Sequence, residues 1–360
     1  MSPTMKNRPK KILFICGSIN QTTQMHAISK ELPEFRHAFT PYYGSRDFDV
    51  AKALGGLENT IGGHKLGRRC LDYLRDHDLP CEVGGALNDF DLALHCSDLI
   101  WPSNLNGKKV ILVQEGMTDP PSLLYPVIRR VRALPGWLAG TSAFGLSDRY
   151  TKFCVASEGY RDLFTSRGCD RTKMVVTGIP NFDDCKRYAR NAFPHKGFVL
   201  CCTSDVREVF WYEDRKAFIL RAVQIAKERN KPLIFKLHPN EKLPRATDEI
   251  AKWAPGALVY TSGSAEEMVA NCDTLICKYS SLAYVGMALG KEVFSHFDLA
   301  ELRALLPLQH GQAAKNIAAV AREMLGSDSA VRSERVANGT LRAVGGTGST
   351  VAPNGKLVGV

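Results

Sequence analysis

Short apolar runs alternate with helical patterns along almost the whole chain. The runs are separated by segments in which apolar residues recur every three or four positions. This combination is typical of parallel sheets that are covered by helices on both faces. The predicted strands are residues 11–16, 92–96, 110–114, 153–156, 174–177, 198–203, 233–237, 257–260, 274–277 and 292–295.

A stretch with Pro and Lys at residues 191–196 separates two such series of strands and helices. The sequence therefore predicts an α/β protein of two doubly wound, Rossmann-like domains that face each other across a cleft. The first domain is predicted to span residues 1–190, and the second residues 191–325, ending in a helix at 313–325. From 326 to 360 the composition changes to Gly, Ser, Thr and Val without periodicity, which predicts a flexible tail.

The composition agrees with two α/β domains and limits the kinds of partner and cellular location that are expected. The 360 residues suffice for two domains, and the net charge of +10 favours anionic partners. The eleven cysteines are scattered and form no CxxC pair, which favours reduced thiols and a cytoplasmic protein. No apolar run reaches the roughly 18 residues of a membrane span. The Asp-Phe-Asp sequences at 47–49 and 89–91 do not follow strands, so no metal site is expected.

Ligands of doubly wound sheets bind beyond the carboxyl ends of the strands, so residues directly after predicted strands are the candidates. In the first domain, Gly17 and Ser18 form a small-residue turn that suits an anion, with an ordinary tight turn as the alternative. Glu115, followed by Gly116, ends another strand, where burial would raise the pKa of its carboxyl group and suit it to proton transfer. Capping of the next turn explains Glu115 equally well.

Two turns of the second domain carry further candidates. Asp205 follows the first strand of this domain and would lie across the cleft from Glu115, as in the carboxylate pairs of glycosyl chemistry. An N-cap role explains this Ser-Asp sequence more simply. His238 and Pro239 follow the next strand, and Pro239 prevents a helix from starting there. The imidazole is therefore free to reach a phosphate or a ribose.

The remaining candidates are anion-binding groups in the same domain. Ser280 and Ser281 open a helix, whose N-terminal N–H groups and dipole favour a phosphate. For these serines plain helix capping is the alternative. The predicted donor-binding set is completed by residues of the same or similar turns: Lys236, Gly263, Ser264 and Lys278. Together these turns favour phosphate or nucleotide binding in the second domain.

The order of these motifs resembles that of bacterial GT-B glycosyltransferases that use CMP-activated sugars, such as sialyltransferases and Kdo (3-deoxy-octulosonic acid) transferases. The shared elements are an acidic turn, a His-Pro turn and a Ser-Ser helix start: Glu115-Gly116, His238-Pro239 and Ser280-Ser281. The additional Asp205 is most similar to the retaining β-Kdo transferases of capsule and O-antigen synthesis. The resemblance covers residues 11–325 in architecture.

The resemblance implies an enzyme that transfers a sugar acid, with Kdo favoured over sialic acid, from its CMP donor to a bacterial surface glycan or a lipid-linked glycan. His238, Ser280 and Ser281 would hold the nucleotide. Asp205 would attack the anomeric carbon and form a covalent adduct, so that the anomeric configuration is retained. Glu115 would deprotonate the acceptor hydroxyl. No metal or other cofactor would be needed.

Two related activities stay open as alternatives, a CDP-glycerol-type glycerophosphotransferase and a sugar-nucleotide 2-epimerase. Nucleic-acid binding without catalysis is disfavoured, because the chain has no RRM-like, zinc-finger or helix-turn-helix signature. Residues 123–138 mix apolar side chains with three arginines and a tryptophan, which predicts either contact with an anionic membrane or a solvated helix face. The expected location is the cytoplasm, with peripheral contact at the inner face of the bacterial inner membrane.

Overall fold

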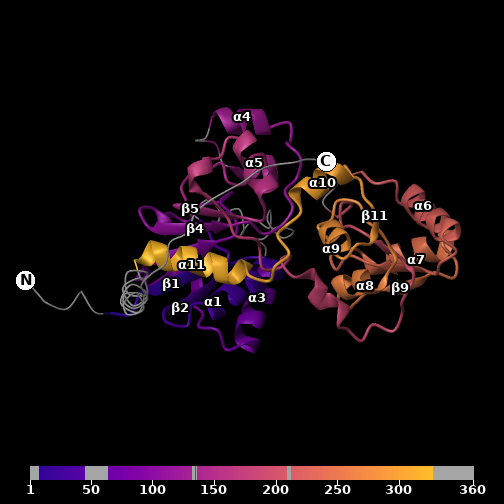
Figure 1. Cartoon of the computed structure of the whole chain (residues 1–360), viewed down its shortest axis with the longest axis horizontal. Coiled ribbons are helices and arrows are strands. Elements are labelled where there is room, and N and C mark those ends of the chain that lie inside the picture. Colours follow the sequence, from indigo (N-terminus) through magenta and orange to yellow (C-terminus); the bar gives the residue numbers. More distant parts are fainter. Residues whose placement is uncertain (1–7, 45–63, 132–133, 135, 209–211, 327–360) are drawn as a thin grey trace, which may run out of the picture.

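Two parallel sheets form the frame of the molecule, one in each half of the chain (Figure 1). The computed structural model describes residues 8–44, 64–131, 134, 136–208 and 212–326. In spatial order the first sheet consists of β2 (Arg36–Pro41), β1 (Lys11–Cys16), β3 (Leu92–His95), β4 (Lys109–Val113), β5 (Lys152–Val155) and β6 (Met174–Val176). The second consists of β11 (Glu292–Phe294), β10 (Thr274–Ile276), β7 (Val199–Cys202), β8 (Leu233–Lys236) and β9 (Leu258–Tyr260).

All paired strands run parallel, which confirms the predicted α/β class with two doubly wound domains. Parallel strands need crossover connections, and helices provide most of them. The helices are α1 (Ile19–Lys30), α3 (His64–Asp76), α4 (Tyr125–Arg130), α5 (Glu158–Ser166), α6 (Arg215–Glu228), α7 (Leu243–Trp253), α8 (Ala265–Asn271), α9 (Leu282–Ala288), α10 (Leu299–Leu305) and α11 (Ala313–Leu325).

Every predicted strand is present, with ends that differ by at most one residue. The sequence analysis missed β2, which pairs with β1 at the edge of the first sheet. Its first residue, Arg36, is exposed and His37 is only partly buried, so the strand lacks the continuous apolar run that marks the central strands. An edge strand needs less apolar surface because one side has no strand neighbour.

Helix α11 returns to the first domain and lies across it (Figure 1). Its buried residues Ile317 and Ala321 share a hydrophobic core with Ile12 and Phe14 of β1. The assignment of residues 191–325 to the second domain is therefore wrong for α11. The spacing of apolar residues shows that a helix has a buried face, but it does not show which sheet covers that face. The predicted tail, apart from Gly326, lies outside the described residues.

Helices α5 and α10 join the two halves of the molecule at close range. A Cβ atom on Gly159 of α5 would lie 1.9 Å from the carbonyl oxygen of Ala304 in α10. The Ser157 hydroxyl donates to the carbonyl oxygen of Leu305 at 3.1 Å. Beside this contact, the Tyr160 and Tyr284 hydroxyls hydrogen-bond at 2.7 Å in a buried position. The junction thus requires glycine at position 159.

We predict that Gly159→Ala lowers the free energy of unfolding by about 1–3 kcal/mol, because the added methyl group forces α5 away from α10. Urea and thermal unfolding measure the change. Gly67 in α3 is the matched control, because a Cβ there meets no atom within 4 Å. Gly67→Ala should raise stability by about 0.5–1 kcal/mol, and equal effects of the two substitutions would contradict the close contact.

Candidate functional site

The strand order of the second sheet reverses between β7 and β10. The chain adds β8 and β9 on one side of β7, and then β10 and β11 on the other. Ligand crevices of open parallel sheets form at such a reversal, outside the carboxyl ends of the strands. Asp205 follows β7, while Ser280 and Ser281 follow β10. Two of the predicted motifs therefore flank this point, and the His-Pro turn after β8 lies next to them.

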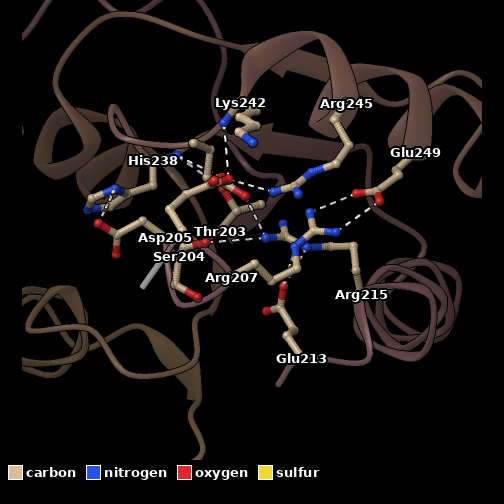
Figure 2. Close-up of polar contacts among 12 residues, drawn as sticks. Thr203, Ser204, Asp205, Arg207, Glu213, Arg215, His238, Lys242, Arg245 and Glu249 are labelled. Carbon is tan, nitrogen blue, oxygen red and sulfur yellow. Dashed lines mark hydrogen bonds and ion pairs between the residues drawn. The ribbon is translucent and has the colours of Figure 1, made fainter. Parts of the chain in front are cut away.

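Asp205 and His238 meet at this edge of the sheet (Figure 2). The His238 Nδ1 atom lies 3.5 Å from Asp205 Oδ2. Asn240 links the two groups, because its side-chain amide donates to Asp205 Oδ2 at 3.0 Å and its backbone N–H donates to His238 Nδ1 at 3.3 Å. Since Nδ1 accepts a hydrogen bond, the ring proton is assigned to Nε2. Sequence reasoning did not identify Asn240.

Burial lowers the pKa of His238, although the negative charge of Asp205 acts in the opposite direction. The imidazole is therefore neutral at pH 7 and can donate a hydrogen bond through Nε2. Among the described residues Asp205 caps no helix, which was the simpler explanation of its sequence context, and its Oδ2 atom accepts a hydrogen bond from the side chain of Asn240. The side chains of both residues are about one-third exposed, at 30% for Asp205 and 36% for His238, so a ligand can reach them.

Thr203 and a buried carboxylate bind the backbone of the His238 turn, and Figure 2 shows Thr203 and Arg215 close to this turn. The backbone N–H of His238 donates to Thr203 Oγ1 at 3.0 Å and to Glu241 Oε2 at 3.2 Å. The Thr203 hydroxyl in turn donates to Glu241, and Arg215 forms an ion pair with the other carboxylate oxygen. The side chains of Arg215 and Glu241 are 3% and 1% exposed, so the charges compensate each other inside the protein.

The lysines next to these turns have internal partners, which differs from the predicted contact with a donor. Lys278 Nζ lies 3.0 Å from Glu213 Oε1 and above the ring of Phe218. Glu213 also pairs with Arg215, at 2.6 Å, and so extends the buried network. Lys236 Nζ donates to the carbonyl oxygen of Leu237 at 2.9 Å. A lysine before a turn is a weak signal, because its flexible side chain can fold back into the domain.

The serines of the second domain have different surroundings. Ser264 caps α8, since its hydroxyl accepts the Glu267 N–H at 3.2 Å, and Gly263 before it has a positive φ of 88°. Ser264 therefore has the capping role that was the alternative explanation. Ser280 accepts the Leu282 N–H at 3.3 Å, whereas Ser281 makes no capping hydrogen bond with its side chain. The Ser281 hydroxyl is thus available to a ligand.

In the first domain, Glu115 lies in a polar cluster built by α1. Ser18 donates to one carboxylate oxygen at 2.7 Å and Gln21 to the other at 2.6 Å. A Cβ on Gly17 would lie 2.1 Å from the side-chain oxygen of Gln21, so glycine makes room for this arrangement. Burial raises the pKa of Glu115 in spite of both hydrogen bonds. Gln21 was missed because nothing in its sequence context marks it.

Phe182 lies between the Glu115 turn and helix α9 of the second domain. Phe182 lies 3.5 Å from where a Cβ of Gly116 would be, and its ring centroid lies 6.3 Å from that of Tyr284 in α9. Within the part of the chain that the structure describes, no hydrogen bond or ion pair joins Glu115 to Asp205 or His238. Their joint action on one substrate stays a prediction.

The Asp-Phe-Asp sequences do not form a metal site among the described residues. The described residues contain no group of three or more His, Cys, Asp or Glu side chains placed to hold a metal ion. Asp89 and Asp91 of one Asp-Phe-Asp sequence instead bind Lys11 at the start of β1. The other sequence, residues 47–49, lies outside the described residues. No described helix has the length and apolar character needed to cross a membrane.

Comparison with known proteins identifies the fold. No protein-family profile matches the chain, and no curated protein matches it either. Among solved structures, a wall teichoic acid polymerase TagF variant soaked with CDPG has 12% identity and a TM-score of 0.52, over 89% of this chain and 90% of that chain. The UDP-GlcNAc 2-epimerase from Neisseria meningitidis, bound to UDP-GlcNAc, has 15% identity and a TM-score of 0.54, over 88% and 91%.

The UDP-GlcNAc 2-epimerase from Methanocaldococcus jannaschii has 12% identity and a TM-score of 0.53, over 87% of this chain and 99% of that chain. The chain has the GT-B fold. At identities this low the likeness extends to the fold alone, in which two Rossmann-like domains lie side by side (Figure 1).

We predict that Glu241→Gln lowers the free energy of unfolding by about 3 kcal/mol, because it removes one of the two buried carboxylates that pair with Arg215 and leaves Glu213 as the remaining one. Urea unfolding measures the change. The control is Glu34→Gln, since Glu34 pairs with Arg322 at the surface, where the side chains are 42% and 31% exposed. It should cost less than about 1 kcal/mol. Similar losses in both variants would contradict the special role of the buried pair.

We predict that the His238 imidazole titrates below its ordinary pKa of 6.5, and lower still in Asp205→Asn, because the Asp205 charge raises this pKa against the effect of burial. Ring-proton NMR over a pH series measures both midpoints. Asp248→Asn, at an exposed position of α7, is the control and should leave the midpoint unchanged. A midpoint that rises or does not move in Asp205→Asn would disprove the electrostatic pairing.

Proposed function

We propose that the chain is a glycosyltransferase that moves a sugar acid, Kdo rather than sialic acid, from its CMP donor to a bacterial surface glycan or lipid-linked glycan. The main support is the pairing of Asp205 with His238 at the point where the second sheet reverses its strand order. A carboxylate and a neutral hydrogen-bond donor lie together there, beside the Ser280-Ser281 turn. This is the set of groups that the resemblance to retaining β-Kdo transferases implies.

In the proposed first step, His238 Nε2 donates to the donor phosphate, and Ser280 and Ser281 bind the same phosphate from the other side. Asn240 holds Asp205 Oδ2, which leaves Oδ1 as the attacking atom. A bond forms between this oxygen and the anomeric carbon, while the bond from that carbon to the phosphate oxygen breaks. The electron pair leaves with CMP, whose developing charge is stabilised by hydrogen bonds.

In the second step, the acceptor hydroxyl attacks the anomeric carbon and releases Asp205. Glu115 accepts the hydroxyl proton, and the burial that raises the pKa of Glu115 makes it a stronger base than a solvated carboxylate. Two successive inversions at one carbon retain its configuration. The proposed chemistry uses side chains alone, without a metal or other cofactor. The proposed setting is the cytoplasmic face of the inner membrane.

Two alternatives share this fold. The structural likeness to TagF soaked with CDPG favours a glycerophosphotransferase, and the likeness to UDP-GlcNAc 2-epimerases favours an epimerase. Neither reaction requires a covalent sugar adduct on Asp205. Because the alternatives differ in nucleotide and in adduct, one experiment separates them.

We predict that the protein, mixed with CMP-Kdo in a single turnover without acceptor, gains the mass of one Kdo residue in intact-protein mass spectrometry. Asp205→Ala should abolish the adduct, because it removes the attacking oxygen. CMP-sialic acid, CDP-glycerol and UDP-GlcNAc are run in parallel as competing donors.

The exposed Asp248→Ala variant is the control for loss of a carboxylate in the same domain, and it should form the adduct at the wild-type rate. A persistent adduct in Asp205→Ala would eliminate the nucleophile role. Turnover of CDP-glycerol or UDP-GlcNAc with no reaction of either CMP-sugar would replace the proposal by the corresponding alternative.

A further inference from the structure

A cavity of about 400 Å³ lies between the two domains, next to the Glu115 turn. Its wall includes Met117 and Thr118, which directly follow that turn. Most of the remaining surface is aromatic or aliphatic, with Tyr160 from α5, Tyr284 from α9 and Leu302 from α10. A ligand in this cavity would therefore contact both domains and lie beside the proposed base.

One cation is buried in the wall of this cavity. Arg167 is only 9% exposed, and burial lowers its pKa. Its guanidinium donates to Thr118 Oγ1 at 3.0 Å and to the Asp119 carbonyl oxygen at 3.1 Å, both neutral acceptors. The Asp119 carboxylate raises the pKa of Arg167 through its charge but forms no ion pair with it, and it accepts a hydrogen bond from the Thr141 hydroxyl. No carboxylate in the described part of the chain forms an ion pair with Arg167, which is unusual for a buried charge.

A second arginine shares the wall with Arg167. Arg129, at the end of α4, is exposed, and the positive charges of both arginines lower the pKa of the Tyr125 phenol, although burial raises it overall. No carboxylate among the described residues pairs with Arg129 either. Glu301, at an exposed position, is the one acidic side chain among the described residues that line the cavity. The charge of the wall therefore suits an anion at the α4 side.

The surface outside the cavity is apolar on the same side. We call Leu123, Leu124 and Val127 the α4 ridge; these side chains are 98%, 50% and 50% exposed. Helix α4 contributes Tyr125 and Arg129 to the cavity, and Val127 of the ridge lies on the opposite side of the same short helix. Adjacent large apolar side chains on a protein surface are typical of sites that bind a partner or a lipid.

We infer that this cavity and ridge bind a phosphorylated lipid. In the proposed complex the phosphate binds Arg129 and Arg167, the apolar chain fills the part of the cavity lined by tyrosines and leucines, and its far end passes around α4 to the ridge. Charge complementarity selects this occupant, because an apolar wall alone would suit any hydrophobic ligand, whereas a buried arginine with only neutral hydrogen-bond acceptors favours an anion. In relation to catalysis the inference rests on the proposed function, for which it supplies the lipid part of the acceptor.

The test is titration of the full chain with farnesyl phosphate, without nucleotide, followed by isothermal titration calorimetry. Farnesol and inorganic phosphate, each alone, are the two comparison arms and should bind at least tenfold more weakly. Arg167→Gln and Arg129→Gln should each weaken farnesyl phosphate binding about tenfold or more. Arg130→Gln is the matched control, because Arg130 is the next residue, is also exposed and is not among the residues that line the cavity.

Arg130→Gln should bind within twofold of the wild type. If Arg167→Gln does not fold, Leu302→Trp, which fills the cavity, and the comparison of Arg129 with Arg130 decide the question. Absence of binding by the wild type, equal losses in Arg129→Gln and Arg130→Gln, or equal binding of farnesol would overturn the inference. Each outcome is independent of the donor experiment, since a Kdo adduct on Asp205 forms without lipid, and lipid binding needs no nucleotide.

Discussion

Parallel pairing of all strands is the constraint on which the candidate site depends. In a parallel sheet every strand ends at the same edge, so residues that follow different strands meet there although they are far apart in sequence. Asp205 and His238 are separated by 33 positions, yet their side chains lie 3.5 Å apart because β7 and β8 are neighbours in register. The same geometry brings Ser18 to Glu115, which follow β1 and β4.

A buried ion network fixes the backbone of the His238 turn, while the His238 side chain stays accessible to solvent. A turn at the edge of a sheet has backbone N–H groups that no neighbouring strand binds. In the absence of a ligand, these N–H groups need hydrogen-bond acceptors from the protein itself or from water. Thr203 and Glu241 accept the His238 N–H from inside the domain. The imidazole edge therefore remains available on the outer side. The ionic cost of burying Glu241 is offset by Arg215, so the network stabilises the turn only as a complete set.

The sequence predicted the parts of this molecule that depend on local pattern. Central strands were predicted correctly because continuous apolar runs mark them, and most of the candidate site residues were chosen because they follow such a run. The edge strand β2 lacks this run and was missed. Helix α11 was assigned to the second domain although it packs against the first, because the spacing of apolar residues does not show which sheet a helix covers. Contacts that depend on tertiary structure, such as Gln21 with Glu115, had no sequence signal.

The domain junction explains why a ligand site between the domains is compatible with a stable fold. At α5 and α10 the backbones approach so closely that Gly159 has no room for a side chain, whereas the neighbouring surface of α4 and α5 stays apart from α9 and α10 and leaves the cavity. This tight contact and the neighbouring Tyr160–Tyr284 hydrogen bond help to hold the domains together, and the adjacent gap can then be lined by residues that do not pack against each other. Arg167, which pairs with no carboxylate among the described residues, is costly in such a gap. An anionic ligand bound in the cavity would supply the missing charge.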